Sequence, residues 1–277
     1  MRTIVTHKNP HLDEIACIWL IKNFLLGWSD ARLKFIPTNP SGGSIKNPDA
    51  SSNTMYIGVG RGKFDEHKGN LADSATTLVY TFICASQRKK NTSIIAAALD
   101  YIVQFVNDDD HGRHINSSFA EFSISAALAY LPKKDGTSSA QITKIGMQYL
   151  DGIFLCLQEK FQLEEDWRRI HSFISPWGKA IGLETTVSAK AVLRRALQDK
   201  VELVVVLNPK NKFRSIRALA GTKVDLTKSF EQAHRLEPHA EWYLHQSKRM
   251  LICGSDVAEN KILSKLPLKK IIDLIRV

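Results

Sequence analysis

The stretch "TIVTHKNPHLDEIACIWLIKNF", residues 3–24, decides how the first half of the chain folds. It opens on a short apolar run that is typical of a strand, and the spacing of its later apolar residues predicts a helix over residues 13–26. Two imidazoles and a carboxylate, those of His7, His11 and Asp13, lie between the two elements. A metal site explains this arrangement, and so does a polar turn formed by chance.

Strand and helix patterns continue to alternate through the first half. They predict strands over residues 2–6, 33–38 and 55–60, and helices over residues 72–87 and 93–107, followed by an acidic loop over residues 108–114. Such alternation is typical of parallel strands covered by helices, with ligands bound at the carboxyl ends of the strands. We therefore expect an α/β fold.

The second half predicts a separate unit. Residues 140–173 have the pattern of one long amphipathic helix, and strand and helix patterns resume near Trp177. The predicted elements are strands over residues 179–185 and 201–207, a strand, turn and strand within 241–255, and helices over 188–199, 229–236 and 266–275. We predict a first domain over residues 1–135, a helical connector over 136–176, and a smaller α/β domain over 177–277.

The charge of the chain favours a polyanionic partner. Its 277 residues carry a net charge of +10, and a large share of the Lys and Arg lies within residues 186–277. Nucleic acid is the first candidate and an anionic membrane surface the second, although a generally basic surface explains the charge equally well. No apolar run reaches the roughly 18 residues of a membrane span, so we expect no membrane partner.

The N-terminus and the cysteines predict a cytoplasmic protein. The N-terminus lacks the basic region and apolar stretch of a signal peptide. Cys17, Cys84, Cys156 and Cys253 lie far apart in the chain. This spacing is not typical of a disulfide framework or a zinc cluster, so we expect buried free thiols in a reducing compartment.

Three loops of the first half combine histidine with carboxylates: His7, His11 and Asp13 in the first; Asp65, Glu66 and His67 in the second; Asp108, Asp109, Asp110, His111 and His114 in the third. Each loop alone is typical of a capped or solvated turn. Together, at element boundaries of one unit, they favour a site for one or two Mn²⁺, Mg²⁺, Fe or Zn²⁺ ions. A structural zinc site is disfavoured because the set contains no thiol.

These loops resemble motifs of a known family. "THKNPHLDEIAC" (6–17) is similar to the first motif of the DHH phosphoesterase superfamily, and most of all to that of the melanocyte-proliferating-gene (MYG) type exonucleases, T-H-x-G-x-x-H-x-D-E-A. The segments "YIGVGRGKFDEHKGNLADSATTLVY" (56–80), "VNDDDHG" (106–112) and "WYLHQSKRMLICGSDVAENKILSKL" (242–266) resemble later MYG segments in the same order. The resemblance spans nearly the whole chain. It implies a DHH-like metal-binding first domain and a substrate-binding C-terminal domain.

The resemblance also implies the metal ligands. His7, His11, Asp13 and Asp110 would bind Mn²⁺ or Mg²⁺, as one or two ions. Glu66 stands where the family has a histidine ligand, and a carboxylate at that position can still bind a hard cation.

Further residues would act on the substrate. The resemblance implies that His67, beside Asp65, binds a phosphate oxygen or assists protonation of the leaving group. In the C-terminal domain, His245 would contact the substrate phosphate, and Lys248 and Arg249 would add positive charge. A solvated hairpin turn also explains Lys248 and Arg249.

One departure from the family pattern concerns activity. The strand-end Asp that bridges two metals in the family matches Gly58, which has no side chain to offer. The site then holds one metal well, or gains a second metal with substrate, or has lost hydrolysis. Asp65 reaching in from the following loop would compensate for the missing ligand.

The resemblance and the charge together favour a hydrolase. We expect a metal-dependent phosphodiesterase or exonuclease that acts on single-stranded RNA, oligonucleotides or related nucleotides. The alternative is a catalytically degenerate DHH-like module that binds nucleotide or nucleic acid as a sensor or regulator. A phosphatase-like enzyme for small phosphorylated metabolites is a third and weaker prediction. A homodimer is left open.

Overall fold

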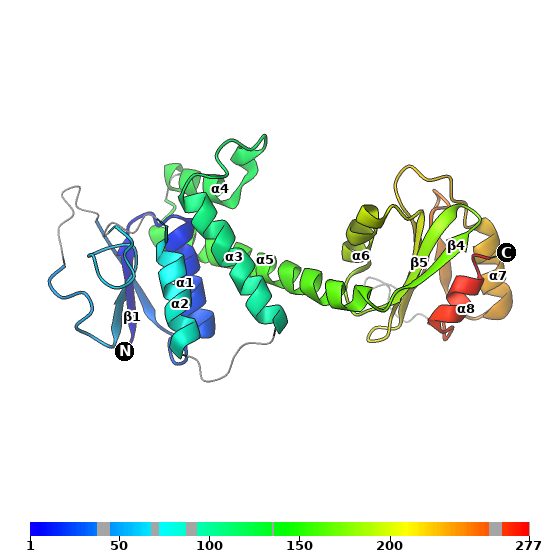
Figure 1. The fold of residues 1–277 in the computed structure, drawn as a ribbon, viewed down its shortest axis with the longest axis horizontal. Coiled ribbons are helices and arrows are strands. Elements are labelled where there is room, and N and C mark those ends of the chain that lie inside the picture. The colour runs from blue at the N-terminus through cyan, green and yellow to red at the C-terminus, as the bar shows by residue number, and fades with distance from the viewer. Residues whose placement is uncertain (38–44, 68–71, 87–92, 135, 255–261, 277) are drawn as a thin grey trace. The chain divides into compact units, whose positions relative to one another are not determined.

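The protein is described by a computed structural model that covers residues 1–37, 45–67, 72–86, 93–134, 136–254 and 262–276 (Figure 1). It divides into two compact units, Met1–Gln158 and Glu159–Val277. The first unit contains β1 (Thr3–His7), α1 (Leu12–Phe24), β2 (Arg32–Ile36), β3 (Thr54–Tyr56), α2 (Ala75–Ser86), α3 (Ser93–Asp110), α4 (Ile124–Tyr130) and two short 3₁₀ helices, η1 (Ala120–Phe122) and η2 (Leu131–Lys133). Helix α5 (Ser139–Trp167) begins in the first unit and ends in the second.

The first unit contains a three-stranded parallel sheet in the order β2-β1-β3. Val5 of the central strand pairs with Lys34 of β2 and with Tyr56 of β3. Because the strands run in one direction, their carboxyl ends share one edge of the sheet, and His7 ends β1 there. The structure confirms the prediction of an α/β unit with a parallel sheet and covering helices.

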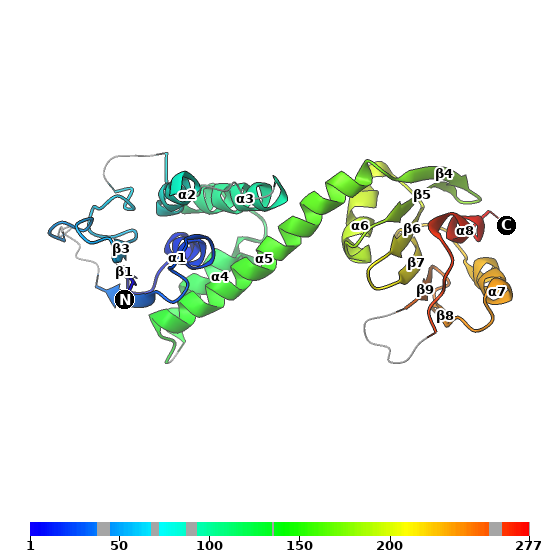
Figure 2. The ribbon, with the colours of Figure 1, turned by 90° about the horizontal axis from the view of Figure 1, so that it is seen from below.

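Helix α1 lies at the centre of the first unit. Residues 12–21 of this helix are all buried, as expected for a helix that is apolar on every side. Figure 2 shows α1 between α2 and α3 on one side and α4 on the other. Helix α5 also approaches α1 closely, since a Cβ atom on Gly146 would lie 2.8 Å from Cγ2 of Ile15. The loop that precedes α1 is therefore attached to the centre of the core.

The second unit is built on a mixed sheet in the order β4-β5-β6-β7-β9-β8. Its elements are β4 (His171–Ser175), β5 (Gly178–Glu184), α6 (Ala189–Ala196), η3 (Leu197–Asp199), β6 (Leu203–Asn208), β7 (Phe213–Ala218), α7 (Thr227–Leu236), β8 (Trp242–Leu244), β9 (Met250–Cys253) and α8 (Leu268–Asp273). Strand β6 runs parallel to β5 and antiparallel to β7. Alternate residues of β6 face opposite sides of the sheet: Leu203 and Val205 share a core with α8, and Val204 and Val206 share another with α6. The predicted second α/β unit is therefore present with its own core.

Several elements differ from the sequence patterns. The long helix ends at Trp167, not near residue 173, because His171–Ser175 forms β4 and pairs with β5. Pro176 also disfavours helix at the residue before it. The patterns did not indicate β4, β7 or α4. Strand β3 ends at Tyr56, and the chain turns at Gly58, whose φ is +61°.

The acidic segment that we expected in a loop is partly helical. Asp108, Asp109 and Asp110 form the last turn of α3. Carboxylates are unfavourable at the negative end of a helix, which is why the sequence indicates a loop. Here Asp108 forms an ion pair with Arg113, and the positive φ of Gly112 ends the helix. The helix therefore fixes the position of Asp110.

The prediction that all cysteines are buried is half wrong. All four lie in described parts of the chain and are free thiols. Cys17 and Cys253 are buried, whereas Cys84 and Cys156 are exposed, on α2 and α5. Among the described residues, no helix combines the length and the apolar character that crossing a membrane requires.

Candidate metal centre

His7 presents its Nε2 atom to a carboxylate. Its Nδ1 atom lies 2.8 Å from the backbone oxygen of Lys8, and because a carbonyl oxygen only accepts, Nδ1 carries a proton. The Nε2 atom lies 3.1 Å from Oε1 of Glu14. An unprotonated Nε2 would place a lone pair against that oxygen, so the contact requires either a second proton on the ring or a cation. This is the tautomer in which histidine binds metals through Nε2.

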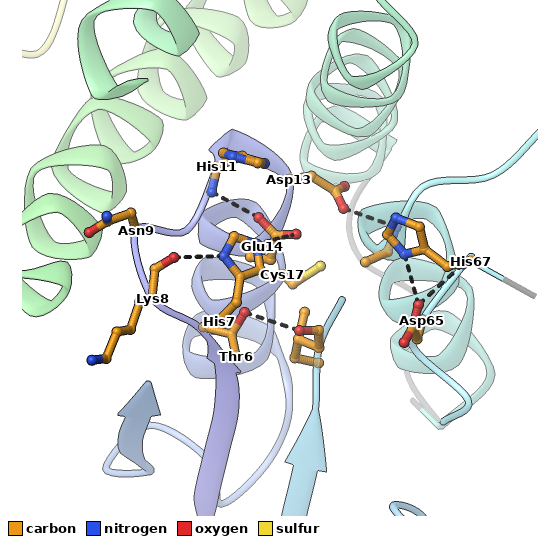
Figure 3. A network of polar contacts seen from close by, with 12 residues as sticks. Thr6, His7, Lys8, Asn9, His11, Asp13, Glu14, Cys17, Asp65 and His67 are labelled. Atoms are coloured by element: carbon orange, nitrogen blue, oxygen red, sulfur yellow. Dashed lines mark hydrogen bonds and ion pairs between the residues drawn. The ribbon is translucent and has the colours of Figure 1, made fainter. Parts of the chain in front are cut away.

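Glu14 lies between His7 and His11 (Figure 3). It is buried, and its Oε2 atom accepts a hydrogen bond of 2.8 Å from the backbone N–H of His11 at the start of α1. Burial raises the pKa of Glu14. The hydrogen bond with the His7 side chain and the charge of His7 lower this pKa by more than burial raises it, so the net shift is downward. Burial lowers the pKa of His7, and Glu14 outweighs this effect, so the net shift is upward. The opposite shifts of the two pKa values favour an ionised Glu14 beside a positively charged His7.

Asp13 is buried and points toward the first turn of α2. Its two carboxylate oxygens accept hydrogen bonds from the backbone N–H groups of Ala75 and Thr76, at 3.0 and 2.9 Å. Burial and the neighbouring charge of Glu14 nevertheless raise the pKa of Asp13 to about 6, against these hydrogen bonds. The carboxylate is held firmly in place, but its charge is incompletely balanced.

The loop after β3 supplies Asp65, Glu66 and His67. Asp65 is buried, and its Oδ1 atom accepts hydrogen bonds from the backbone N–H and from Nδ1 of His67, at 3.2 and 2.9 Å. The side chain of His67 is 70% exposed. The hydrogen bond to Asp65, then the charges of Glu66 and Asp65, raise the pKa of His67 against partial burial. His67 is therefore an oriented, solvent-accessible imidazole.

Glu66 and Asp110 complete an acidic group with Asp13. Potential ligand atoms of these three carboxylates lie within 4.8 Å of one another. Burial, followed by the charge of Asp13, raises the pKa of Glu66 to about 7. Burial and the charge of Glu14 raise the pKa of Asp110. Three carboxylates from three separate segments thus lie close together, and the positive charge around them does not balance their negative charge.

A second group adjoins the acidic one. Potential ligand atoms of His7, His11 and Glu14 also lie within 4.8 Å of one another, as do those of Asp65, Glu66 and His67. The rings of His7 and His11 are 5.1 Å apart between centroids. A cavity of about 240 Å³ opens beside the centre, and His11, Asp13 and Asp110 contribute to its lining. The structure thus brings together the first-unit residues that the resemblance singles out.

The histidines of the third loop have other neighbours. Nδ1 of His111 lies 2.6 Å from the backbone oxygen of Asn107. The ring of His114 stacks on that of Phe105, with 5.0 Å between centroids.

The predicted substrate-binding residues lie in the second unit, at the β8–β9 turn. Nδ1 of His245 lies 2.8 Å from Oγ of Ser247. Nζ of Lys248 lies 3.6 Å from a carboxylate oxygen of Asp225, and both side chains are about half exposed. Arg249 donates hydrogen bonds to the backbone oxygen of Leu219 and to Thr222. Arg249 therefore ties this turn to the loop after β7.

Glu14 is the residue of the centre that the sequence patterns did not single out as a ligand. In sequence it appears as an ordinary acidic residue in the first turn of a helix. It lies three residues after His11, the residue that precedes the helix, which is the spacing of a capping box and hides any other role. The structure links it to Gly58, since a Cβ atom there would lie 2.6 Å from Oε1 of Glu14.

No family model and no curated protein sequence matches the chain. Several solved structures are similar to it at low identity, among them the following three. A pGpG-specific phosphodiesterase, PggH from Vibrio cholerae, is 12% identical with a TM-score of 0.34, over 91% of this chain and 92% of that one. RecJ of Thermus thermophilus in complex with Mg²⁺ is 13% identical with a TM-score of 0.29, over 99% of this chain and 49% of that one. An uncharacterized protein from Helicobacter pylori is 12% identical with a TM-score of 0.26, over 99% of each chain. Likeness of this degree does not transfer an activity or a ligand to this chain.

Proposed function

We propose that the protein is a metal-dependent phosphodiesterase that hydrolyses single-stranded RNA, oligonucleotides or related nucleotides. One observation carries the proposal: donors from residues 7–14, 65–67 and 110 form adjoining groups at the carboxyl end of a parallel sheet. Ligands of α/β proteins bind at this edge. The motif resemblance and the net charge of +10 support a phosphodiester of a polyanion as the substrate.

The donor chemistry fits a divalent cation. Oε2 of Glu66 is buried and has no hydrogen-bond partner among the described residues. The pKa values of Asp13, Glu66 and Asp110 are all raised, so their ionised forms lack a compensating charge. Carboxylates suit Mg²⁺ and Mn²⁺, and the imidazoles of His7 and His11 favour Mn²⁺ of the two. Asp13, Glu66 and Asp110 would hold one ion, and His7, His11 and Glu14 a second.

The residues of the chain divide the remaining work. A bound cation supplies a Lewis acid that offsets the negative charge of the phosphodiester. The Asp65 carboxylate keeps the proton of His67 on Nδ1, and a doubly protonated His67 can then donate from its other nitrogen to the leaving oxygen. In the second unit, His245, Lys248 and Arg249 would bind phosphate groups of the substrate.

The test uses the full chain after removal of metal with a chelator. Calorimetric titration with MnCl₂ and MgCl₂ measures binding. A labelled single-stranded RNA, a DNA of the same sequence and a panel of linear and cyclic dinucleotides are then incubated with and without Mn²⁺. We expect Mn²⁺ binding and Mn²⁺-dependent products. Asp110→Asn should lose the products and the ion held by the acidic group. Absence of binding and of products across the panel would contradict the proposal.

The dependence of the apparent KM on salt distinguishes a polyanionic substrate from a small phosphorylated metabolite. If a polyanion is the substrate, its apparent KM rises steeply with salt because phosphate contacts release counterions. A KM that barely changes with ionic strength would instead indicate a small phosphorylated metabolite.

A second candidate function is nucleotide or nucleic-acid binding without turnover. Gly58 favours it, since the strand end carries no ligand, and so does Glu66 in place of histidine. Tight binding of an oligonucleotide without products, unchanged in Asp13→Ala, would identify a sensor or regulatory module.

A further inference from the structure

The side chain of Glu14 occupies the space beside Gly58 at the carboxyl end of β3. A Cβ atom on Gly58 would lie 2.6 Å from Oε1, 3.1 Å from Cγ and 3.3 Å from Cδ of Glu14. The first distance is shorter than real Cβ contacts and the other two are tight, so any side chain at position 58 would displace the Glu14 carboxylate. The two positions therefore share one space, and only one of them can fill it.

The Glu14 carboxylate is held in place through one oxygen, and its other oxygen is available as a metal ligand. Oε2 is engaged by the N–H of His11 at 2.8 Å. Oε1 faces Nε2 of His7 at 3.1 Å. Since Nδ1 of His7 donates to the backbone oxygen of Lys8, Nε2 is the ring atom that faces Oε1. In the metal-free protein a second ring proton bridges the two atoms, and when that proton leaves, both atoms have lone pairs to offer to a cation. A buried carboxylate and a buried imidazole in this arrangement converge on a site that a cation can occupy.

We propose that Glu14 supplies, from the first turn of α1, the carboxylate ligand that the strand end at Gly58 does not provide, and that Gly58 is required because it leaves room for it. This inference rests on the proposed metal centre and concerns its ligand set. Gly58 was the main argument against hydrolysis, because it leaves the strand end without a ligand. If Glu14 supplies that ligand, glycine at position 58 is compatible with an active metal centre. The Asp65 carboxylate orients the loop after β3, since it accepts hydrogen bonds from the backbone N–H groups of Arg61 and His67 and from Nδ1 of His67.

Positions 14 and 58 should therefore be exchangeable as a pair. The φ of +61° at Gly58 lies in the left-handed region, which aspartate tolerates better than most residues with a side chain. In Gly58→Asp alone, the new side chain collides with Glu14. In the double variant Glu14→Ala with Gly58→Asp, the collision is relieved and one carboxylate is again present.

The experiment measures Mn²⁺ binding to the metal-free full chain by calorimetry, with circular dichroism and thermal unfolding to verify folding. Glu14→Gln retains the shape of the side chain and the acceptor for the His11 N–H but removes the charge. We expect it to weaken Mn²⁺ binding by at least about 10-fold, the lower bound for residues that support a metal site. Gly58→Asp should also weaken binding. The double variant Glu14→Ala with Gly58→Asp should bind more tightly than the matched control, Glu14→Ala with Gly58→Ala.

The outcomes separate this inference from the proposed function. If Glu14→Gln binds Mn²⁺ as tightly as the unmodified chain, Glu14 is only the ion-pair partner of His7 and the inference is overturned. It is also overturned if the double variant with aspartate at position 58 binds no better than its matched alanine control while both are folded. If Mn²⁺ binding follows the expected order but no substrate is hydrolysed, the ligand assignment holds and the hydrolase proposal fails. An unmodified chain that binds no Mn²⁺ overturns both.

Discussion

Asp13 and Thr76 are joined by two reciprocal hydrogen bonds. The backbone N–H of Thr76 donates to Oδ1 of Asp13 at 2.9 Å, and the hydroxyl of Thr76 donates to the backbone oxygen of Asp13, also at 2.9 Å. Because Thr76 lies in the first turn of α2, the carboxylate also balances the positive end of that helix. Asp13 therefore connects the first turns of α1 and α2 in addition to its proposed role as a metal ligand.

We expect Asp13→Ala to destabilise the metal-free protein. The substitution leaves the buried N–H groups of Ala75 and Thr76 without acceptors, at a cost of about 1–3 kcal/mol for each unsatisfied group. Urea unfolding in the presence of a chelator, near pH 5, measures the effect. Asp30→Ala, at an exposed position, is the control and should change stability by less than about 0.5 kcal/mol. Equal unfolding midpoints for the two variants would show that Asp13 does not hold α2.

The metal-free protein should become less stable as the pH rises from about 4 to about 7. The pKa of Asp13 is raised from 3.8 to about 6 and that of Glu66 from 4.5 to about 7, so in this range the folded state binds more protons than the unfolded state. Stability therefore falls with rising pH. Asp13 contributes about 2–3 kcal/mol to this loss, at about 1.4 kcal/mol per pKa unit. His7, whose pKa is also raised, acts in the same direction.

Thermal unfolding at several pH values, with a chelator and then with saturating Mn²⁺, tests this expectation. A bound cation stabilises the ionised carboxylates, so Mn²⁺ should abolish or reverse the decline. Metal-free protein that gains stability between about pH 5 and pH 7 would contradict the charge balance described for the acidic group.

Asp65→Asn should lower the pKa of His67. The hydrogen bond from Nδ1 of His67 to Asp65 is the largest cause of the raised pKa, and a neutral amide removes both the charge and much of the bond strength. Titration of the His67 ring signals by NMR measures the shift, and Glu66→Gln should give a smaller one. If the enzyme is active, the basic limb of its pH–rate profile should move down by the same amount. A His67 pKa that Asp65→Asn leaves in place would remove the basis for its proposed role as a proton donor.

Two glycines of α5 should respond oppositely to alanine. At Gly146 the new Cβ atom would lie 2.8 Å from Cγ2 of Ile15, so Gly146→Ala should cost about 1–3 kcal/mol through overpacking against α1. At Gly152 the Cβ atom would meet no heavy atom of the described residues within 4 Å, and Gly152→Ala should stabilise the helix by up to about 1 kcal/mol. Urea unfolding of the two variants provides the comparison. Stabilisation by both would mean that α1 and α5 are not in contact at Gly146.

The architecture of the first unit could be predicted because its signals are local. The apolar run at residues 3–6, the unbroken apolar stretch at residues 15–21 and the alternation that follows specify a parallel sheet without reference to distant contacts. Strands β4 and β7 could not be predicted in this way. Their sequences, "HSFIS" and "FRSIRA", are short and partly polar, and they become strands through pairing with β5, β6 and β9.

The candidate site could be predicted in part, for a similar reason. His7, His11 and Asp13 are close in sequence, so their proximity in space follows from the loop between a strand and a helix. The resemblance implied the contributions of Glu66 and Asp110, but their approach to Asp13 depends on how α3 and the loop after β3 pack. Glu14 was not singled out because its proposed role depends on the space left by Gly58, far along the chain, and a helix pattern alone does not reveal that space.

The complete burial of residues 12–21 in α1 has a consequence for the order in which the molecule opens. Amide hydrogens in such a helix exchange with solvent only when most of the surrounding unit unfolds. The amides of residues 15–21 therefore belong to the slowest-exchanging part of the first unit, and Asp13 and Glu14 are carried by the turn that begins it. His67, on an exposed loop, follows the faster motions of the surface. If the proposed centre binds a cation, its loss should leave the side chains of Asp13 and Glu14 in position, arranged to bind metal again.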